Sequence, residues 1–484
     1  MSVRVRVGPS LKRPLSVGAL RLALFNYAFA EANSGAFIIR IEDTDRTRLD
    51  ARLLDDLYAM LDWTGIQYHE GGEKGGNHGP YIQSERASVY RAHAHRLVKA
   101  GRAYFCFCSA KQLEEIRAKE RTAHRPSRYD GRCFRLSPEQ SWKRVDGGEK
   151  HVVRMRVPRE NHDSDLAVHD ALRGTINIRL STLDDQILIK SDGMPTYHFS
   201  SVVDDHLMDI THVIRADVWL VNTPKHLLLY EWFGWDPPQF VHVPPLSGGI
   251  YGTAVRHLKD AGFLPDAVVN FAGMMGWRQH ADQELFSLRD MTTSFRLDQL
   301  RPSCGGADPA RLRWLGAQHI RRRPVSQLAE DVRPFLDTTA VPDSSTKSRQ
   351  RAARLLRHHA ATLEDLADQF SRAYLPARPT PEDLLQVKPH NEALLSVVTA
   401  LGSLDDATDA GIRHTIESFC RDHGVPLGSL LRALRFALFS SQSNPDIYAM
   451  IELIGVEEAA RRVADVSRLL AEQSPCGTRE DDHV

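Results

Sequence analysis

The sequence predicts an α/β domain built on a parallel sheet, interrupted by an insertion and followed by an all-helical domain. Two observations carry this prediction. The first residues read as strand, loop, helix and strand, which is the pattern of a βαβ unit and implies parallel strands. Beyond about residue 310, apolar residues recur at spacings of three and four, as they do on helix faces.

The predicted βαβ unit begins at residues 3–7, where valines alternate with arginines and indicate a strand with one buried face. A helix follows over Gly18–Glu31, and Phe37–Ile41 form the second strand. Ligands of such folds bind at the carboxyl ends of the strands. Glu42 comes directly after the second strand, so we expect it to face a ligand crevice.

The chain divides into five segments by composition. Residues 1–100 and 186–310 are expected to form the two halves of the sheet domain, and residues 101–185, with basic turns and a Cys-x-Cys sequence, look like an insertion between them. Residues 311–472 are expected to be all-helical, and residues 473–484 to form a flexible polar tail.

Further elements are expected within these segments. Strand patterns occur at His151–Val157, Gln186–Lys190 and Thr211–Arg215, and a helix over Asn222–Phe233 is terminated by Gly234. The helical segment carries its clearest periodicity at residues 349–361, 427–438 and 456–470.

Composition limits the function classes. Among 484 residues, 62 basic side chains balance 62 acidic ones, which excludes a uniformly basic nucleic-acid binder and leaves a local basic surface open. Six cysteines are too few for a disulfide framework and indicate a reducing compartment. Without a signal-peptide or membrane-spanning run, we expect a soluble protein of the cytoplasm or an organellar matrix, with no membrane insertion. GxGxxG and Walker A sequences are absent.

Several long motifs occur in a fixed order. They are FIIRIEDTDRTR (37–48), GPYIQSER (79–86), KSDGMPTYHFSSVVDDHLMDITHVIRADVWLVNTP (190–224), GFLPDAVVNFAGMMGW (262–277) and LRALRFALFSSQSNPDIYAMIELIG (431–455). Together they resemble glutamyl-tRNA synthetase, a class I aminoacyl-tRNA synthetase, nearly from end to end. The resemblance implies a Rossmann-like catalytic domain with an inserted acceptor-binding domain and an all-α anticodon-binding domain. It also implies glutamate and tRNA(Glu) as ligands, with ATP as cofactor and Mg²⁺ if the chain is active.

The resemblance assigns a glutamate pocket to Arg6, Ser10, Glu42, Tyr197 and Arg215. Guanidinium groups can hold a carboxylate, and Glu42 can accept hydrogen bonds from an α-ammonium group. By the same resemblance, Gly18 and Trp219 lie near ATP, and Ser201 stands where the family often has an asparagine. Without the family, the arginines could equally be structurally paired and the tryptophan an ordinary core residue.

Two family signatures are altered. The first reads approximately PSPTGxLHIGGAR in the family and PSLKRPLSVGALR at residues 9–21 here, so Ser16 replaces the histidine that faces the phosphates. Lys12 and Arg13 replace small residues that allow close approach to a nucleotide. The second, the KMSKS-type loop, has no Lys-x-Ser-Lys counterpart within residues 244–261. We therefore predict that ATP-dependent activation is weak or absent.

A Cys-x-Cys sequence and a later Tyr-Asp-Gly-Arg-Cys sequence resemble the zinc-bearing insertion of some bacterial members. The resemblance implies the ligands Cys106, Cys108, Tyr129 and Cys133. Such a set would form a closed, structural zinc site. Arg135 stands where some relatives have a histidine, which leaves the fourth ligand open, and the alternative is a group of partly buried free thiols.

Basic side chains recur at the start of the helical segment, where relatives meet tRNA. The cations expected to contact it are Arg321, Arg322, Arg323, Lys347, Arg351 and Arg354. Spacings of three and four place several on one helix face, as phosphate contacts require, although a solvated face would look the same.

Three functional hypotheses follow. The chain is a working glutamate–tRNA ligase with replaced ATP motifs, a non-catalytic pseudoenzyme that binds tRNA, or a structural subunit of a larger assembly. Glutamate-binding positions survive better than ATP-binding ones, which favours a ligand-binding role over a pure scaffold.

Overall fold

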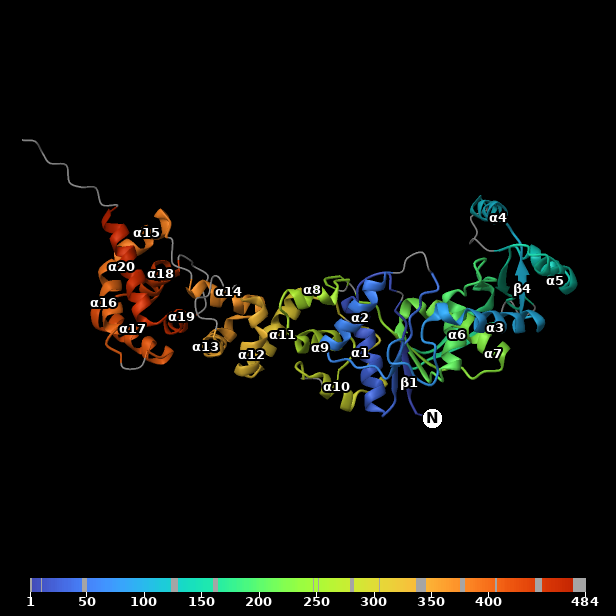
Figure 1. Ribbon diagram of the computed structural model, residues 1–484, viewed down its shortest axis with the longest axis horizontal. Helices are drawn as coiled ribbons and strands as arrows, with labels where there is room; N and C mark the ends of the chain where they lie inside the picture. Colours follow the sequence, from blue (N-terminus) through green and yellow to red (C-terminus); the bar gives the residue numbers. More distant parts are fainter. Residues whose placement is uncertain are drawn as a thin grey trace, which may run out of the picture. The chain divides into compact units, whose positions relative to one another are not determined.

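The chain folds into two compact units. They comprise residues 1–258 with 268–311, and residues 259–267 with 312–484 (Figure 1). The computed structural model describes residues 2–9, 11–45, 50–122, 129–159, 164–246, 248–250, 252–278, 283–303, 305–336, 345–374, 379–404, 407–439 and 446–472. The predicted tail at 473–484 lies outside them.

The predicted βαβ unit is present. Strand β1 (Arg4–Val7) pairs in parallel with β2 (Ala36–Ile39), which pairs in parallel with β3 (Glu70–Gly71). Helix α1 (Val17–Ala32) connects the first two strands and is buried over most of its surface. The parallel-sheet prediction is therefore confirmed.

A second sheet extends this arrangement. Its order is β7-β6-β10-β9, formed by β6 (Asp165–Asp170), β7 (Gly174–Arg179), β9 (His212–Ala216) and β10 (Gln239–Val243). Strand β10 is parallel to both of its neighbours. Strand β9 lies beside β1, where the N–H of Thr211 donates to the carbonyl of Arg4 at 2.9 Å.

A third sheet is antiparallel and has the order β4-β5-β8. Its strands are β4 (Ala103–Cys106), β5 (Val152–Met155) and β8 (Ile187–Ile189). Strand β8 lies after residues 101–185, and the β6–β7 hairpin from that segment pairs with β10. Both sheets to which the segment contributes therefore also contain strands from outside it.

One expectation for β1 is wrong. Alternation predicted one buried and one exposed face, yet Val5 and Arg6 are both buried, at 0% and 4% exposure. Arg6 tolerates burial because Asp205 supplies a bidentate carboxylate partner. The charge of Arg6 thus belongs to a buried, ion-paired residue rather than to a solvated face.

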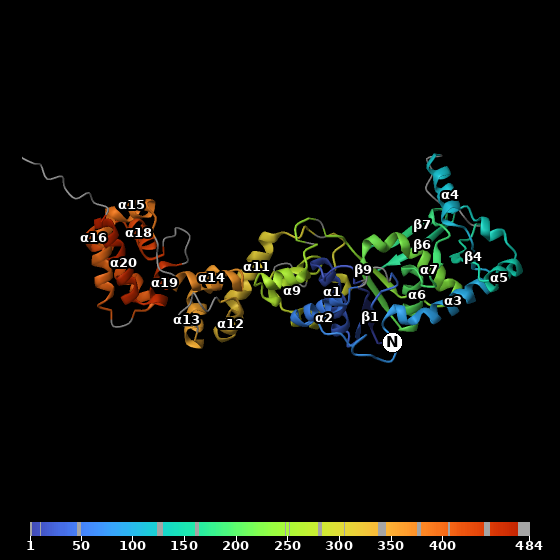
Figure 2. The same ribbon diagram turned by 45° about the horizontal axis from the view of Figure 1, so that its top comes forward.

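Nine further α-helices precede α11 among the described residues, and most are labelled in Figures 1 and 2. They are α2 (Ala51–Trp63), α3 (Ala87–Lys99), α4 (Ala110–Thr122), α5 (Pro138–Asp146), α6 (Tyr197–Leu207), α7 (Thr223–Phe233), α8 (Val255–Asp260), α9 (Pro265–Met274) and α10 (Leu288–Ser294). Helix α7 ends where predicted, because Gly234 adopts φ 69°, a left-handed conformation that favours glycine.

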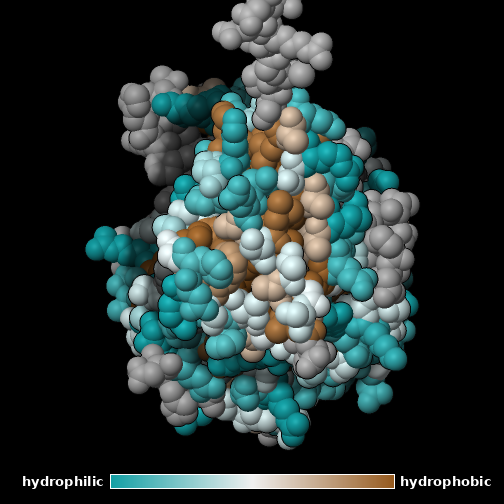
Figure 3. All heavy atoms as spheres, turned by 90° about the vertical axis from the view of Figure 1, so that its left-hand side faces the viewer, coloured by the Kyte–Doolittle hydropathy of each residue, from teal (hydrophilic) through white to brown (hydrophobic). Residues whose placement is uncertain are grey.

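The described part of the C-terminal unit is helical. Its helices are α11 (Pro309–Arg322), α12 (Val325–Asp331), α13 (Thr346–Leu356), α14 (Leu363–Tyr374), α15 (Pro381–Val387), α16 (Asn391–Leu401), α17 (Asp409–His423), α18 (Leu427–Phe439), α19 (Ile447–Ile454) and α20 (Val456–Glu472). This confirms the predicted all-helical domain. On the face shown in Figure 3, apolar side chains form a stripe among polar ones. Among the described helices, none is long and apolar enough to cross a bilayer.

Candidate functional site

A cavity of about 420 Å³ lies at the carboxyl ends of β1, β2 and β9. Its polar wall is defined by Arg6, Glu42, Tyr197 and Arg215, and its apolar wall by Leu15, Leu22, Leu57 and Leu61. The structure therefore brings together four of the five predicted glutamate-binding residues. The fifth, Ser10, lies outside the described residues.

Arg6 is neutralised by a buried carboxylate. Its Nε and Nη2 donate to the two oxygens of Asp205 at 2.9 and 3.0 Å, and Arg40 Nη1 donates to the same carboxylate at 2.6 Å. Burial alone would raise the pKa of Asp205, but Arg6 and Arg40 outweigh it and lower the pKa to about 2. Asp205 therefore stays ionised and fixes both arginines.

Arg215 is held differently. It is 5% exposed, and among the described residues no carboxylate lies within ion-pair distance of its guanidinium. Its hydrogen-bond partners are neutral: Nε donates to His242 Nε2 at 3.0 Å, and Nη2 donates to Thr223 Oγ1 at 2.9 Å. Burial lowers the pKa of Arg215. A buried cation without an anion is costly, so this part of the cavity favours a ligand that supplies one.

Glu42 contributes the negative charge of the polar wall. Its Oε1 accepts from Arg40 Nη2 at 3.1 Å. Burial raises its pKa, although Arg40 and Arg6 act in the opposite direction. Gly8 makes room for it, because a Cβ at Gly8 would lie 2.2 Å from the carboxyl carbon of Glu42. The remaining acceptor capacity suits an ammonium group.

Two aromatic side chains complete the cavity. Tyr197 begins α6, and Trp219 lies in the short helix Asp217–Asn222; their ring centroids are 4.5 Å apart. Trp219 lines the cavity and is half-buried. Gly18 is buried in the first turn of α1 and is not among the cavity-lining residues.

Ser201 lies beneath the polar wall. It is fully buried, and its Oγ accepts from Arg6 Nη2 at 3.4 Å. Its hydroxyl also donates to Asp205 at 3.5 Å. The position where the family often has an asparagine therefore belongs to the network that orients Arg6.

The first altered signature meets the loop before α8. The N–H of Val17 donates to the carbonyl of Thr253 at 3.0 Å, and the N–H of Val255 donates to the carbonyl of Leu15 at 2.8 Å. Ser16 Oγ accepts from the N–H of Ala19 at 3.2 Å and caps α1. Two of the first three N–H groups of this helix are thus used within the chain, whereas anion binding at a helix N-terminus requires them free.

Long side chains from the same loop reach solvent. Lys12 lines the cavity, and its Nζ donates to Asp45 at 3.1 Å. Arg13 is exposed. On the other side of the loop, Arg256 of α8 forms an ion pair with Asp56 of α2. These charges are therefore engaged with protein carboxylates or with water.

Sequence reasoning missed several residues that hold the site. Arg40 and Asp205 fix Arg6, while Asp170 and His242 lie behind Arg215. One signal was available for Asp205, because two adjacent acids follow two valines that the structure buries in α6. Asp170 and His242 lie on strands that are neighbours in the sheet but 72 residues apart in the sequence, so no local sequence pattern predicts their pairing.

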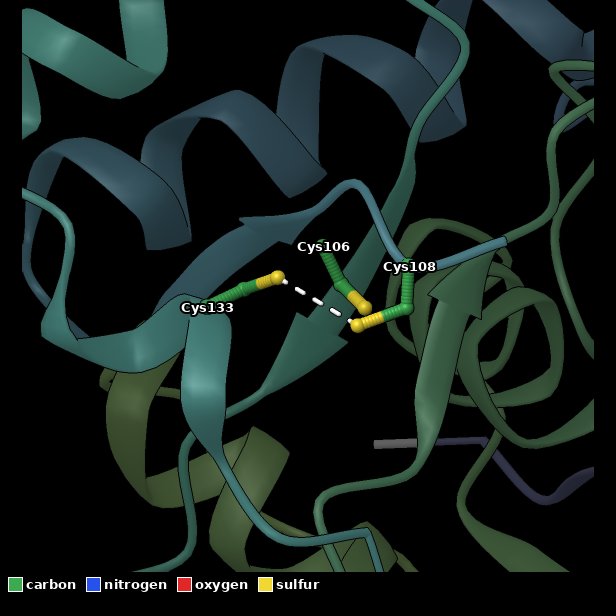
Figure 4. A group of neighbouring side chains, drawn as sticks. All are labelled: Cys106, Cys108 and Cys133. Atoms are coloured by element: carbon green, nitrogen blue, oxygen red, sulfur yellow. Dashed lines mark hydrogen bonds between the residues drawn. The ribbon is translucent and has the colours of Figure 1, made fainter. Parts of the chain in front are cut away.

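Three thiols converge in the inserted segment (Figure 4). The sulfur atoms of Cys106, Cys108 and Cys133 all lie within 4.8 Å of one another, and those of Cys108 and Cys133 are 3.6 Å apart. Tyr129 Oη lies 3.3 Å from the sulfurs of Cys106 and Cys108. Zn–S bonds of about 2.3 Å in a tetrahedron place sulfurs roughly 3.8 Å apart, so the thiols fit a zinc ion.

The surroundings favour a thiolate. The hydrogen bond between Cys133 and Cys106 lowers the pKa of the Cys106 thiol and raises that of Cys133. The guanidinium of Arg154 lies 4.2 Å from the ring centroid of Tyr129. Arg135, the position where some relatives have histidine, is exposed. Tyr129, the predicted fourth ligand, therefore lies beside the sulfurs.

The predicted basic surface lies in two places. Arg321 and Arg322 are exposed at the end of α11, whereas Arg323 is ion-paired with Asp331 at 2.8 Å. The exposed face of α13 carries Lys347, Arg351 and Arg354. The last two form ion pairs with the buried carboxylate of Glu452.

Comparisons with known proteins agree with this geometry. Residues 2–314 match the family model of tRNA synthetases class I (E and Q), catalytic domain, and residues 327–466 match an anticodon binding domain. The glutamate–tRNA ligases of Alkaliphilus metalliredigens and Thermus thermophilus are 34% and 37% identical, over 97% and 95% of this chain and 99% of their own length.

A solved structure is also similar. The crystal structure of a glutamate tRNA ligase from Elizabethkingia meningosepticum, in complex with its amino acid, has a TM-score of 0.87 and 28% identity. The match covers 97% of this chain and 100% of that one. The family resemblance seen in the sequence is confirmed.

Proposed function

We propose, from the premise that this chain belongs to the class I tRNA synthetases of the E and Q family, that it binds glutamate and tRNA(Glu) and that its ATP-dependent activation of glutamate is weak or absent. The proposal of glutamate and tRNA(Glu) as ligands rests on the relatives, which are named glutamate–tRNA ligases. The proposal of reduced activation rests on two loops of this chain, residues 9–21 and the loop before α8.

The observation that supports glutamate most strongly is the buried Arg215 without a carboxylate partner. A glutamate side chain would supply the missing anion, and Tyr197 stands in the same wall. Glu42 would receive the α-ammonium group, since it is the carboxylate of this wall. Glutamine would leave the guanidinium uncompensated, so the site should prefer the acid to its amide.

The reduced activation is supported by the bonds between the two altered loops. Catalysis of phosphoryl chemistry depends on donors and cations preorganised at the phosphates, and loss of one such donor costs about 10²–10³ in rate. Here the N–H of Val17 is bonded to Thr253, and Ser16 caps α1 in place of a histidine. Mg²⁺ would bind together with ATP, so a chain that does not bind ATP would not bind Mg²⁺ in this cavity.

The decisive assay is glutamate-dependent ATP–pyrophosphate exchange, measured with and without tRNA. We expect exchange orders of magnitude below that of the Thermus thermophilus relative, assayed in parallel. Calorimetry with L-glutamate, L-glutamine and ATP accompanies it, and we expect binding of the first only. Exchange at a rate comparable to the relative would restore the working-ligase hypothesis, and absence of glutamate binding would remove the glutamate site.

The thiol cluster is proposed to hold a structural zinc through Cys106, Cys108, Tyr129 and Cys133. The ion would supply a closed cross-link between β4 and the turn at Gly131. We expect about one zinc per chain by elemental analysis and loss of the metal in Cys133→Ser, with Cys420→Ser as the control. Metal content unaltered by Cys133→Ser would contradict the assignment.

Transfer RNA binding is proposed at the exposed cations of α11 and α13. Filter binding with tRNA(Glu) across several salt concentrations tests it, because each phosphate contact steepens the salt dependence. We expect Lys347→Ala to reduce the log–log slope by about one, and Arg354→Ala to reduce it less, since Glu452 already neutralises that cation. No binding at low salt would favour the alternative of a structural subunit.

A further inference from the structure

Arg215 is oriented by a residue on the neighbouring strand. In the parallel pair β9–β10, Arg215 lies directly opposite His242. The guanidinium Nε donates to His242 Nε2 at 3.0 Å, and the His242 side chain is 0% exposed. Because Nε is the donor nearest the chain, this bond sets the direction in which the two Nη groups point.

The bond requires one tautomer of His242. Nε2 can accept only if it carries no proton, so the proton of a neutral ring must lie on Nδ1. Burial lowers the pKa of His242, which keeps the ring neutral. The Nδ1–H group must then find an acceptor inside the protein.

Asp170 is that acceptor. It ends β6, the strand on the far side of β10, and its Oδ2 lies 2.7 Å from His242 Nδ1. The same oxygen accepts from the backbone N–H of His242 at 2.9 Å. Oδ1 accepts from the N–H groups of Leu172 and Arg173 at 3.0 and 2.9 Å. A carboxylate can only accept, so Asp170 excludes the tautomer with the proton on Nε2.

We infer that Asp170 and His242 are positioning residues, whose hydrogen-bonded pair orients Arg215 and thereby sets the preference of the cavity for an anionic side chain. The three residues form a row across β6, β10 and β9. The inference about ligand preference rests on the proposed glutamate site, whereas the orientation of Arg215 is a property of the protein alone.

Asp170→Asn tests the tautomer at nearly constant shape. One side of the amide must carry the NH₂ group. Facing it toward His242 opposes one fixed donor, the backbone N–H of His242, and a ring that can move its proton to Nε2. Facing it the other way opposes two fixed donors, the N–H groups of Leu172 and Arg173, so the first orientation costs less. Two donors, Arg215 Nε–H and His242 Nε2–H, would then oppose each other. We expect the affinity for L-glutamate to fall about tenfold.

A second variant separates positioning from a structural role. His242→Gln keeps an acceptor at the place of Nε2 and needs no tautomer set by Asp170. We expect His242→Gln to retain glutamate affinity, and Asp170→Asn to have no further effect in that background. His242→Asn keeps only the Nδ1 place and should lose about tenfold. An equal loss from Asp170→Asn in both backgrounds would overturn the inference.

Nuclear magnetic resonance of the full chain decides the orientation without ligand. With ¹⁵N-labelled histidine and arginine, we expect the Nδ1–H tautomer of His242 and a scalar coupling across the bond from Arg215 Nε. Both should disappear in Asp170→Asn. An Nε2–H tautomer in the parent protein would overturn the inference even if glutamate binds, and failure of glutamate to bind, with the coupling present, would count against the proposed function alone.

Discussion

The polar wall of the cavity and the start of α1 differ in how their polar groups are satisfied. In the polar wall, Arg6 is paired with Asp205, while Arg215 is left for an external anion. At the start of α1, beside the apolar wall, the backbone N–H of Val17 and the hydroxyl of Ser16 are already bonded within the chain. A binding site needs polar groups that still lack a partner, so the polar wall is built to receive a ligand, whereas the polar groups at the start of α1 already have partners within the chain.

The two arginines of the polar wall give the largest expected effects. Arg215→Met removes a buried cation that has no carboxylate partner, so we expect glutamate affinity to fall roughly a hundredfold, with thermal stability retained.

Arg6→Met removes a partner of Asp205, so we expect the free energy of unfolding to fall by roughly 3 kcal/mol. Calorimetry with glutamate and denaturant titration measure the two quantities.

Two outcomes would contradict the distinction drawn between Arg6 and Arg215. Equal destabilisation by both substitutions would mean that Arg215 has an internal counter-charge in solution. Glutamate affinity in Arg215→Met within threefold of the parent would mean that another group binds the side-chain carboxylate.

These differences also show what the sequence could predict. The parallel sheet, the helix terminated by Gly234 and the helical C-terminal unit all follow from local patterns, namely periodicity and turn residues. Family motifs assign Arg6, Glu42, Tyr197 and Arg215 to one site, and in the structure all four line one cavity. Their assignment to glutamate stays a proposal.

The rest depended on contacts between distant segments. Arg6 was expected on a strand with one buried face, and only the position of Asp205, far along the chain, explains its burial. Arg354 was expected to meet phosphates, yet it pairs with Glu452. In both cases the charge was visible in the sequence and its partner was not.

The contribution of Asp205 to the free energy of unfolding should depend on pH, and this effect is expected to be smaller than those of the arginine substitutions. Its folded pKa of about 2 lies below the unfolded value of 3.8, so the stability it contributes is present above about pH 4 and is lost as pH falls toward 2. That contribution is about 2 kcal/mol. Asp205→Asn should therefore be less stable than the parent at neutral pH, and the gap should close in acid. A gap independent of pH would show that shape, rather than charge, makes the difference.

The smallest effect is expected at the closed end. Ser16→Ala removes the hydroxyl that caps α1, and loss of such a cap costs about 1 kcal/mol in unfolding free energy. Glutamate affinity should not change, because Ser16 is not one of the residues that line the cavity. Ser16→Thr, which keeps a capping hydroxyl, is the matched control and should recover most of the stability. A capped helix terminus that contacts no ligand can change stability but not ligand affinity. A loss of glutamate affinity in Ser16→Ala comparable to that in Arg215→Met would therefore mean that the start of α1 and the polar wall act as one site.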